Sequence, residues 1–259
     1  MSHDDRAQRE LEYQRQVAAD ELAAMKPTSA AVVRRYQEAA HWRTNRHECV
    51  IRWLTEGKPT HIADYGCGSG EMSVRLGLMG FRVTGYDVSP ELIEAARHRA
   101  QLDGVADRVN FAVCGYGGEG IPDSTYDAVL AMSVLHHVPF PAGVDMLHRM
   151  LKPGGHTAIL EPVAYSRVLQ KLRDLLPVKK DVSPDERQLN HDDLRMIAER
   201  LHIENKRHFY LTQRAGRVLS PARFPRLNEA LRNLDQALLS LPGMTHLAGT
   251  IVLRARKPA

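Results

Sequence analysis

Short apolar stretches alternate with segments of helical periodicity through the middle of the chain. Five stretches of strand length predict β-strands, over residues 61–65, 81–87, 108–114, 126–132 and 156–161. Between them, apolar residues at helical spacing predict helices over 71–80, 89–104 and 141–151. Strands that alternate with helices in this way form a parallel, doubly wound sheet. We therefore predict an α/β fold whose strands end along one common edge, where such sheets bind their ligands.

The chain on either side of this alternation is mostly helical in pattern. Before it, residues 5–56 predict three helices, the first over 5–24, with a break at Pro27 and an end at 57–59. After it, the pattern predicts two more strands, over 202–212 and 248–254. It also predicts three helices, over 164–176, 191–201 and 217–240, the last with breaks at Pro221 and Pro225. We see no internal repeat and no linker that divides the chain. One domain over 1–259 is therefore expected, with a mostly parallel, seven-stranded sheet, an N-terminal helical cap and a helical insertion before the last strand.

Composition adds little beyond the class of protein. Hydrophobic residues make up 43% and charged residues 25% of the 259, as in an ordinary globular domain. Cys49, Cys67 and Cys114 form no disulfide-like framework, which favours a reducing, cytoplasmic compartment. We find no secretory signal and no apolar run of the ~18 residues that a membrane span needs. The net charge of +4 is compatible with an acidic substrate and does not demand nucleic acid, and the oligomeric state stays open between monomer and homodimer.

Glycines stand at every second position directly after the first predicted strand. In "ADYGCGSGEM" (63–72), Asp64 is followed by Gly66, Gly68 and Gly70. A dinucleotide motif GxGxxG would place its third glycine at position 71, where the chain has Glu71, whose charge opposes a pyrophosphate. The spacing Asp-x-Gly-x-Gly-x-Gly instead resembles the first motif of the class I S-adenosylmethionine-dependent methyltransferases.

Three further segments extend this resemblance to residues 60–162. The segments "GYDVSPELIEAAR" (85–97), "YDAVLAMSVLHHV" (126–138) and "RMLKPGG" (149–155) resemble the family's second motif, its fourth-strand motif and the turn before its fifth strand. The chain resembles most closely the small-molecule branch that includes ubiquinone and menaquinone methyltransferases. The resemblance implies a Rossmann-like methyltransferase fold, S-adenosyl-L-methionine as cofactor, and methyl transfer to O, N or C of a small lipophilic or acidic acceptor. It also implies that 1–56 is a cap, 60–162 binds the cofactor and 163–259 covers the substrate.

The same resemblance implies which residues bind the cofactor. Asp64 would orient the cofactor's amino group, and Asp87, at the end of the second strand, would accept hydrogen bonds from the ribose hydroxyls. After the third strand the family often carries Gly-Asp, whose acid binds the adenine amino group, but this chain has Cys114-Gly115. Tyr116 is expected to make that contact instead. The complete expected set is Asp64, Gly66, Cys67, Gly68, Asp87, Val88, Tyr116 and Ser133.

Catalytic and substrate-binding residues are less well defined by the sequence. His136 and His137 follow the fourth strand, and a neutral imidazole could take the proton released by an attacking nucleophile. The sequence does not choose between them. Tyr36, Glu161 and His191 are candidate substrate ligands, each with a structural alternative: core packing, capping of a turn and capping of a helix. No residues have metal-ligand spacing, so metal-independent transfer is expected.

Three other functions remain as alternatives. An RNA or protein methyltransferase would need a basic stripe or a recognition domain, and neither is visible. A non-catalytic cofactor-binding scaffold is supported only by the Cys114-Gly115 departure. A nicotinamide oxidoreductase is disfavoured by Glu71.

Overall fold

The computed structural model describes residues 15–115, 117–165, 188–212 and 225–259. The predicted helix over 5–24 is described from residue 15, where it is helical to residue 24. The predicted helix over 164–176 and the start of the one over 217–240 lie outside the described residues, as does Tyr116. Among the described residues, no helix combines the length and the apolar character that a membrane crossing requires.

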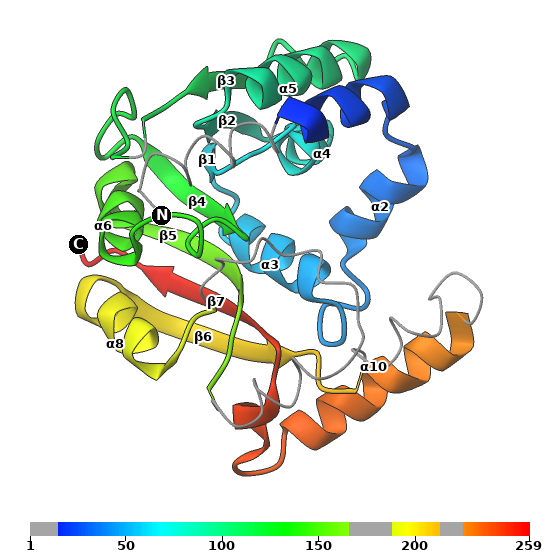
Figure 1. The fold of residues 1–259 in the computed structure, drawn as a ribbon, viewed down its shortest axis with the longest axis vertical. Coiled ribbons are helices and arrows are strands. Elements are labelled where there is room, and N and C mark those ends of the chain that lie inside the picture. The colour runs from blue at the N-terminus through cyan, green and yellow to red at the C-terminus, as the bar shows by residue number, and fades with distance from the viewer. Residues whose placement is uncertain (1–14, 116, 166–187, 213–224) are drawn as a thin grey trace.

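The strands form one seven-stranded sheet in the order β3-β2-β1-β4-β5-β7-β6 (Figure 1). All neighbouring pairs from β3 to β5 are parallel, and β7 is antiparallel to both β5 and β6. The chain order reverses between β1 and β4, which is where a doubly wound sheet binds its ligand. The predicted fold is therefore confirmed. The strands are β1 (His61–Tyr65), β2 (Arg82–Asp87), β3 (Val109–Val113), β4 (Tyr126–Met132), β5 (Leu151–Pro162), β6 (His202–Phe209) and β7 (Thr250–Arg256).

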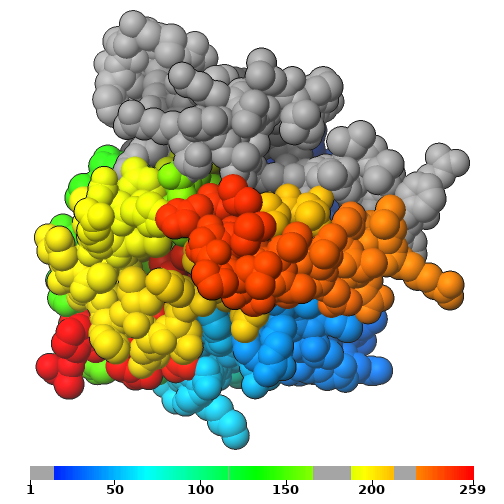
Figure 2. Space-filling model, turned by 90° about the horizontal axis from the view of Figure 1, so that it is seen from below, coloured from blue at the N-terminus to red at the C-terminus, as the bar shows by residue number. Residues whose placement is uncertain are grey.

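Helices cover both faces of the sheet. On one face α3, α4 and α5 pack on the strands, with α2 beside α3, and on the other face lie α6 and α8. Figure 2 shows α8, η1 and α10 side by side across one side of the molecule, next to the N-terminal helices. The bounds are α2 (Ala30–Glu38), α3 (Arg46–Thr55), α4 (Glu71–Leu78), α5 (Pro90–Leu102), α6 (Phe140–Met150), α8 (His191–Arg200), α10 (Pro225–Leu239) and the 3-10 helix η1 (Met244–Leu247).

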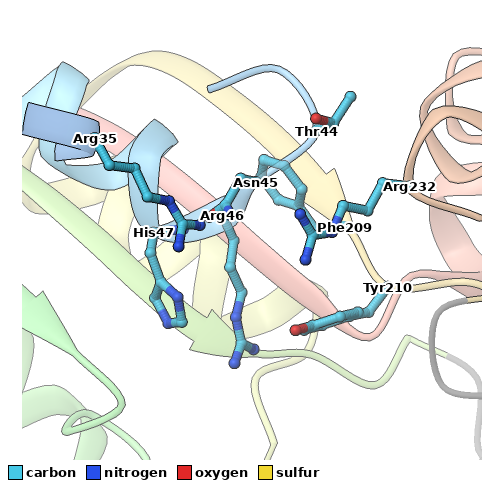
Figure 3. A pocket seen from close by; sticks show the side chains of 8 residues that line it. All are labelled: Arg35, Thr44, Asn45, Arg46, His47, Phe209, Tyr210 and Arg232. Carbon is cyan, nitrogen blue, oxygen red and sulfur yellow. The ribbon is translucent and has the colours of Figure 1, made fainter. Parts of the chain in front are cut away.

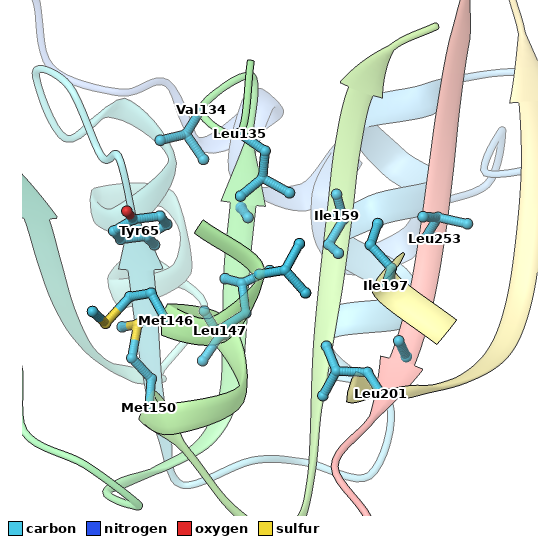
Figure 4. Close-up of a cluster of buried hydrophobic side chains, with 14 of the residues drawn as sticks. Tyr65, Val134, Leu135, Met146, Leu147, Met150, Ile159, Ile197, Leu201 and Leu253 are labelled. Carbon is cyan, nitrogen blue, oxygen red and sulfur yellow. The ribbon is translucent and has the colours of Figure 1, made fainter. Parts of the chain in front are cut away.

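Alternating strand residues supply the two halves of the core. In β4, Val129 belongs to the cluster under α6 and α8, whereas Ala128 and Leu130 belong to the cluster under α3, α4 and α5. Figure 4 shows the first cluster, in which α6 and α8 pack on β1, β4, β5 and β7. Because both faces are buried, the central strands read as continuous apolar runs. The packing of the strands from both sides fixes where their carboxyl ends lie.

Element ends differ from the predictions where backbone geometry intervenes. The strand predicted to begin at residue 156 begins at Leu151, because Leu151 pairs with Tyr126 across a register shift. The strand predicted to reach residue 212 ends at Phe209, since Tyr210 has a φ of 62° that no regular strand contains. The predicted break at Pro225 is the first residue of α10, a position that suits proline because its missing N–H has no intrahelical partner.

Candidate active site

The glycine loop leaves β1 and leads into α4 at the carboxyl edge of the sheet. Its Gly66 and Cys67 N–H groups both donate to the Tyr86 carbonyl oxygen, at 2.8 and 2.9 Å, which ties the loop to β2. Gly66, Gly68 and Gly70 have φ values of 73°, 53° and 76°. These left-handed conformations explain the choice of glycine at all three positions.

The three glycines face different surroundings. A Cβ on Gly70 would lie 2.7 Å from Phe111 Cζ, so this glycine allows α4 to pack closely on β3. A Cβ on Gly66 would collide with the side chain of Val134, in the loop after β4. A Cβ on Gly68 would meet no atom within 4 Å. Gly68 thus presents its backbone to open space, as a loop that receives a ligand must.

Asp87 closes the loop from β2. Its Oδ2 accepts a hydrogen bond from Gly68 N at 2.9 Å, and its Oδ1 accepts one from Ser89 N at 3.0 Å. Burial raises the pKa of Asp87, and these two N–H groups and the nearby His137 oppose that rise. A carboxylate offers roughly four acceptor positions. Asp87 therefore keeps acceptor capacity at the mouth of the loop.

Asp64 lies underneath the loop. It is 3% exposed, and its Oδ2 accepts a hydrogen bond from Ser73 Oγ of α4 at 2.6 Å. Burial, with a smaller contribution from the charge of Asp87, raises its pKa from 3.8 to about 6. No sequence motif had indicated Ser73 as its partner. This carboxyl group changes its charge close to neutral pH.

The other expected cofactor residues lie at the ends of β1, β2 and β4. Cys67 is half-buried with its Sγ 3.6 Å from the Gly68 carbonyl oxygen, and Val88 packs against the core under α6. Ser133 is exposed and has a φ of 54°, while its N–H donates to the Leu160 carbonyl oxygen at 2.9 Å. Such strain in a non-glycine residue is typical of functional turns.

At Cys114-Gly115, where the chain lacks the family's Gly-Asp, the structure places a carboxylate that the sequence did not indicate. A Cβ on Gly115 would collide with Oε2 of Glu119, so the Glu119 carboxylate occupies the space of the missing side chain. That oxygen also accepts a hydrogen bond from Gly117 N at 3.2 Å. Glu119 is exposed. An acidic group is thus present beside the end of β3, although it comes from a position four residues later.

Glu161 and His136 form a buried pair at the ends of β5 and β4. The fully buried Glu161 accepts hydrogen bonds on Oε1 from Val134 N and Leu135 N, both at 2.8 Å. Its Oε2 lies 2.6 Å from Nδ1 of His136, whose side chain is 5% exposed. With Nδ1 directed at the carboxylate, a neutral His136 ring would carry its proton on Nδ1 and present Nε2 as its basic atom. Glu161 therefore holds the loop after β4 in place, which is closer to its structural alternative than to substrate binding.

His137 has different surroundings. Its ring is exposed and lies 4.1 Å from the His136 ring, centroid to centroid, and its charge acts on Asp87. The two histidines, which the sequence left equivalent, thus differ: His136 is held by a carboxylate, and His137 is the one beside Asp87.

Tyr36 and His191 lie apart from this pair. Tyr36 is 6% exposed in the core under α4, and its hydroxyl accepts a hydrogen bond from Arg75 at 3.4 Å, which agrees with core packing. The expectation that His191 caps a helix was wrong. Asn190 caps α8 in a capping box with Asp193. His191 is the first residue of α8 and stacks on Tyr165, with ring centroids 4.3 Å apart.

The loop fits the cofactor that the resemblance implies. Gly68 has open space in front of it, and Asp87 retains acceptor capacity for hydroxyl groups. Asp64 can balance an ammonium group, and Glu119 can accept from an amino group. In the described part of the chain, no group of three or more His, Cys, Asp or Glu side chains could hold a metal ion.

Comparison with known proteins identifies the central part of the chain. Residues 63–159 match the family model described as a methyltransferase domain. A 27-O-demethylrifamycin SV methyltransferase of Amycolatopsis mediterranei is 35% identical over 38% of this chain and 37% of its own length. A ubiquinone biosynthesis O-methyltransferase of Xylella fastidiosa is 37% identical over 36% of this chain and 38% of its own length. The matched region thus spans less than two-fifths of each relative.

Solved structures agree over most of the fold. The cyclase SpnF has a TM-score of 0.60 at 23% identity and covers 83% of this chain and 82% of its own. A SAM-dependent methyltransferase of Methanosarcina mazei has a TM-score of 0.54 at 22% identity, over 76% of this chain and 92% of its own. The predicted Rossmann-like methyltransferase fold is confirmed. Because a cyclase shares it, the fold alone does not fix the reaction.

Proposed function

We propose that this chain, which belongs to the class I S-adenosylmethionine-dependent methyltransferases, transfers a methyl group to O, N or C of a small-molecule acceptor. One juxtaposition carries the proposal: the Gly68–Asp87 hydrogen bond and the Glu161–His136 pair lie at the same edge of the sheet, on neighbouring strand ends. The first provides a site for a nucleoside, and the second provides a base beside it.

Binding of the cofactor is assigned to the loops after β1, β2 and β3. Gly66, Gly68 and Ser133 would offer backbone to its amino-acid end, with Asp64 oriented beneath. Asp87 would accept hydrogen bonds from the ribose hydroxyls. Glu119, in the space beside Gly115, would accept from the adenine amino group, which the sequence assigned to Tyr116. When bound, S-adenosylmethionine supplies a methyl group on a positively charged sulfur that is already activated for displacement.

Catalysis is assigned mainly to alignment. Holding two reactants in line can lower a barrier by ~7–11 kcal/mol. His136 is the proposed base, because Glu161 fixes its ring and its tautomer, and a base contributes ~10²–10⁴-fold where the acceptor must lose a proton. His137, beside Asp87, would line the cofactor site.

The remaining assignments complete the proposal. The helices of residues 1–56 and the segment 163–259 would enclose the acceptor, within one domain. Free thiols at Cys49, Cys67 and Cys114 support a cytoplasmic location. We propose metal-independent transfer without a nucleic-acid partner.

Calorimetric titration with S-adenosylhomocysteine tests the cofactor site. The wild-type protein should bind it with micromolar affinity and should not bind NADH, and Asp87→Ala should abolish binding. Asp107→Ala, an exposed carboxylate before β3, is the matched control and should bind normally. Binding of NADH instead would contradict the proposal.

Transfer itself is tested with methyl-labelled S-adenosylmethionine and a nuclease-treated small-molecule filtrate of cell extract. Label should enter a small molecule, and His136→Gln should slow this step without weakening S-adenosylhomocysteine binding. Tight cofactor binding without any labelled product from any extract would favour a non-catalytic scaffold.

A further inference from the structure

A small, positively charged cavity lies beyond β5 at the same edge of the sheet (Figure 3). Its volume is about 140 Å³, and guanidinium groups of Arg35, Arg46 and Arg232 line it together with His47 and Tyr210. These side chains come from α2, the start of α3, α10 and the end of β6. No motif or spacing in the sequence groups them.

Arg46 is fixed at the carboxyl edge of the central strands. Its Nη1 donates to Thr250 Oγ1 at 3.3 Å, and its guanidinium lies 4.5 Å from the centroid of the Tyr210 ring. Thr250 begins β7 and pairs with Pro162, the last residue of β5. The cavity therefore lies beside the carboxyl end of β5, at the start of β7, which is four strand positions from β2, the strand that carries Asp87.

The positive charge of the cavity is only partly balanced. Arg35 pairs with the buried Glu48, Nε to Oε1 at 2.8 Å, and the other Glu48 oxygen accepts from His41 N. Arg232 forms no ion pair with any residue that the structure describes. Arg232 thus brings a positive charge that no carboxylate in the described ranges pairs with.

Two neighbouring titratable groups agree with a positive cavity. Asp235, one turn beyond Arg232 on α10, directs its carboxylate to Leu211 N and Thr212 N, at 3.0 and 2.6 Å. Burial first, and then the charges of Arg46, Arg35 and Arg75, lower the pKa of His47 to about 4. The imidazole is therefore neutral at pH 7 and adds hydrogen-bonding capacity without charge.

We propose that this cavity binds the anionic group, a carboxylate or a phosphate, of the methyl acceptor; the inference rests on the proposed methyl transfer. A volume of about 140 Å³ holds one such group, because pockets for whole ligands measure ~300–1,000 Å³. Arginine matches both anions with paired N–H donors. Two strand spacings, ~10 Å in all, separate β7 from β4. On this placement the acceptor carries its anionic group two strand positions from the end of β4, after which His136 lies.

The carboxylate of the cofactor is the other anionic group that the cavity could bind. The glycine loop follows β1, which is three strand spacings, ~14 Å, from β7. Asp87 lies one strand further away. The position of the cavity beyond β4 and β5 thus assigns it to the acceptor.

Calorimetric titration with inorganic phosphate tests the proposal on the full chain, with and without saturating S-adenosylhomocysteine. Wild-type protein should bind phosphate in both cases, and Arg46→Met and Arg232→Met should each raise the phosphate Kd at least tenfold. Arg226→Met, an exposed arginine on the same helix as Arg232, is the matched control and should leave the Kd unchanged. Far-UV circular dichroism and the unfolding midpoint verify that each variant is folded.

The outcomes separate this inference from the proposed function. Arginine variants that bind phosphate as tightly as wild type, or wild-type protein that binds none, would overturn the anion site. Variants that no longer bind either S-adenosylhomocysteine or phosphate would show that the cavity binds the cofactor, and would overturn the assignment to the acceptor. Wild-type protein that binds phosphate but not S-adenosylhomocysteine would instead refute the cofactor proposal alone.

The acceptor class is tested by dividing the small-molecule filtrate on an anion-exchange column before labelling. Label should appear in products from the retained, anionic fraction, and excess phosphate should suppress it. Products from the unretained fraction only would refute an anionic acceptor.

Discussion

Replacement of Glu161 by glutamine should weaken the fold measurably, although it changes one atom. The wild-type carboxylate is fully buried and binds two backbone N–H groups at 2.8 Å and His136 Nδ1 at 2.6 Å. A hydrogen bond to a charged group contributes ~1.5–3 kcal/mol, against ~0.5–1.5 for a neutral one. In Glu161→Gln the amide oxygen can keep both backbone donors, so about 2 kcal/mol is lost there. Relief from burying a charge offsets part of any further loss at His136.

The expected decrease in the free energy of unfolding is therefore about 2 kcal/mol for Glu161→Gln. Glu161→Ala should lose more, about 3–6 kcal/mol, because it leaves two backbone N–H groups and the His136 donor buried without an acceptor. Urea unfolding followed by circular dichroism at pH 7.5 measures both. Glu94→Gln, an exposed glutamate on α5, should stay within ~0.5 kcal/mol of wild type.

A second readout separates the base from the scaffold. The glutamine amide is a donor where the carboxylate was an acceptor, so His136 must move its proton to Nε2 in order to accept that hydrogen bond. The Nε2 lone pair is then lost, and transfer to a hydroxyl acceptor should fall by ~10²–10⁴ while S-adenosylhomocysteine still binds. A free energy of unfolding of Glu161→Gln within ~0.5 kcal/mol of the wild-type value would refute the reasoning. Neutralising a buried anion that accepts from three donors should cost more than that.

Four further predictions concern the loops of the site. Asp87→Asn should raise the Kd for S-adenosylhomocysteine ~10–100-fold by calorimetry, because an NH2 group replaces one of the two oxygens that serve Gly68 N, Ser89 N and the ribose hydroxyls. An unchanged Kd would place the ribose elsewhere. The pKa of Asp64 is about 6, so its carboxylate forms between about pH 5 and 7 and then balances the ligand's ammonium group. The affinity for S-adenosylhomocysteine should therefore rise over this pH range, and Asp64→Asn should make the affinity independent of pH there. Glu119→Ala should weaken S-adenosylhomocysteine about tenfold but leave S-inosylhomocysteine, which lacks the adenine amino group, unaffected; equal losses for both would exclude that contact. His136→Gln should slow methyl transfer without changing the cofactor affinity, whereas His137→Gln should mainly change the cofactor affinity. Calorimetry and label-transfer assays on both variants measure this, and the opposite pattern would mean that the two histidines have each other's roles.

The strand and helix pattern could be read from the chain because burial on both faces of a parallel sheet leaves a continuous apolar run for each central strand. β1, β2 and β4 lie within a residue of their predicted ranges. Errors occurred where nonlocal pairing or one backbone angle set an end, as at Leu151 and Tyr210.

The glycine loop could also be predicted from the sequence, but the separate roles of its three glycines could not. The spacing after Asp64 predicted a ligand loop, and the left-handed angles explain why glycine is needed. That Gly70 serves packing depends on where Phe111 lies, 41 residues further along the chain, whereas a Cβ on Gly68 would meet no atom within 4 Å.

By itself the sequence determined the fold and the acidic residue at the end of β2, and it predicted a ligand site at the carboxyl edge, because these follow from local periodicity and short spacings. Only the tertiary structure decided that Glu161 holds His136, that Glu119 fills the space beside Gly115, and that Arg46 and Arg232 share a cavity. Each of these depends on distances between side chains on different elements. Such distances are set when the sheet brings strand ends together, and they leave no periodic trace in the order of residues.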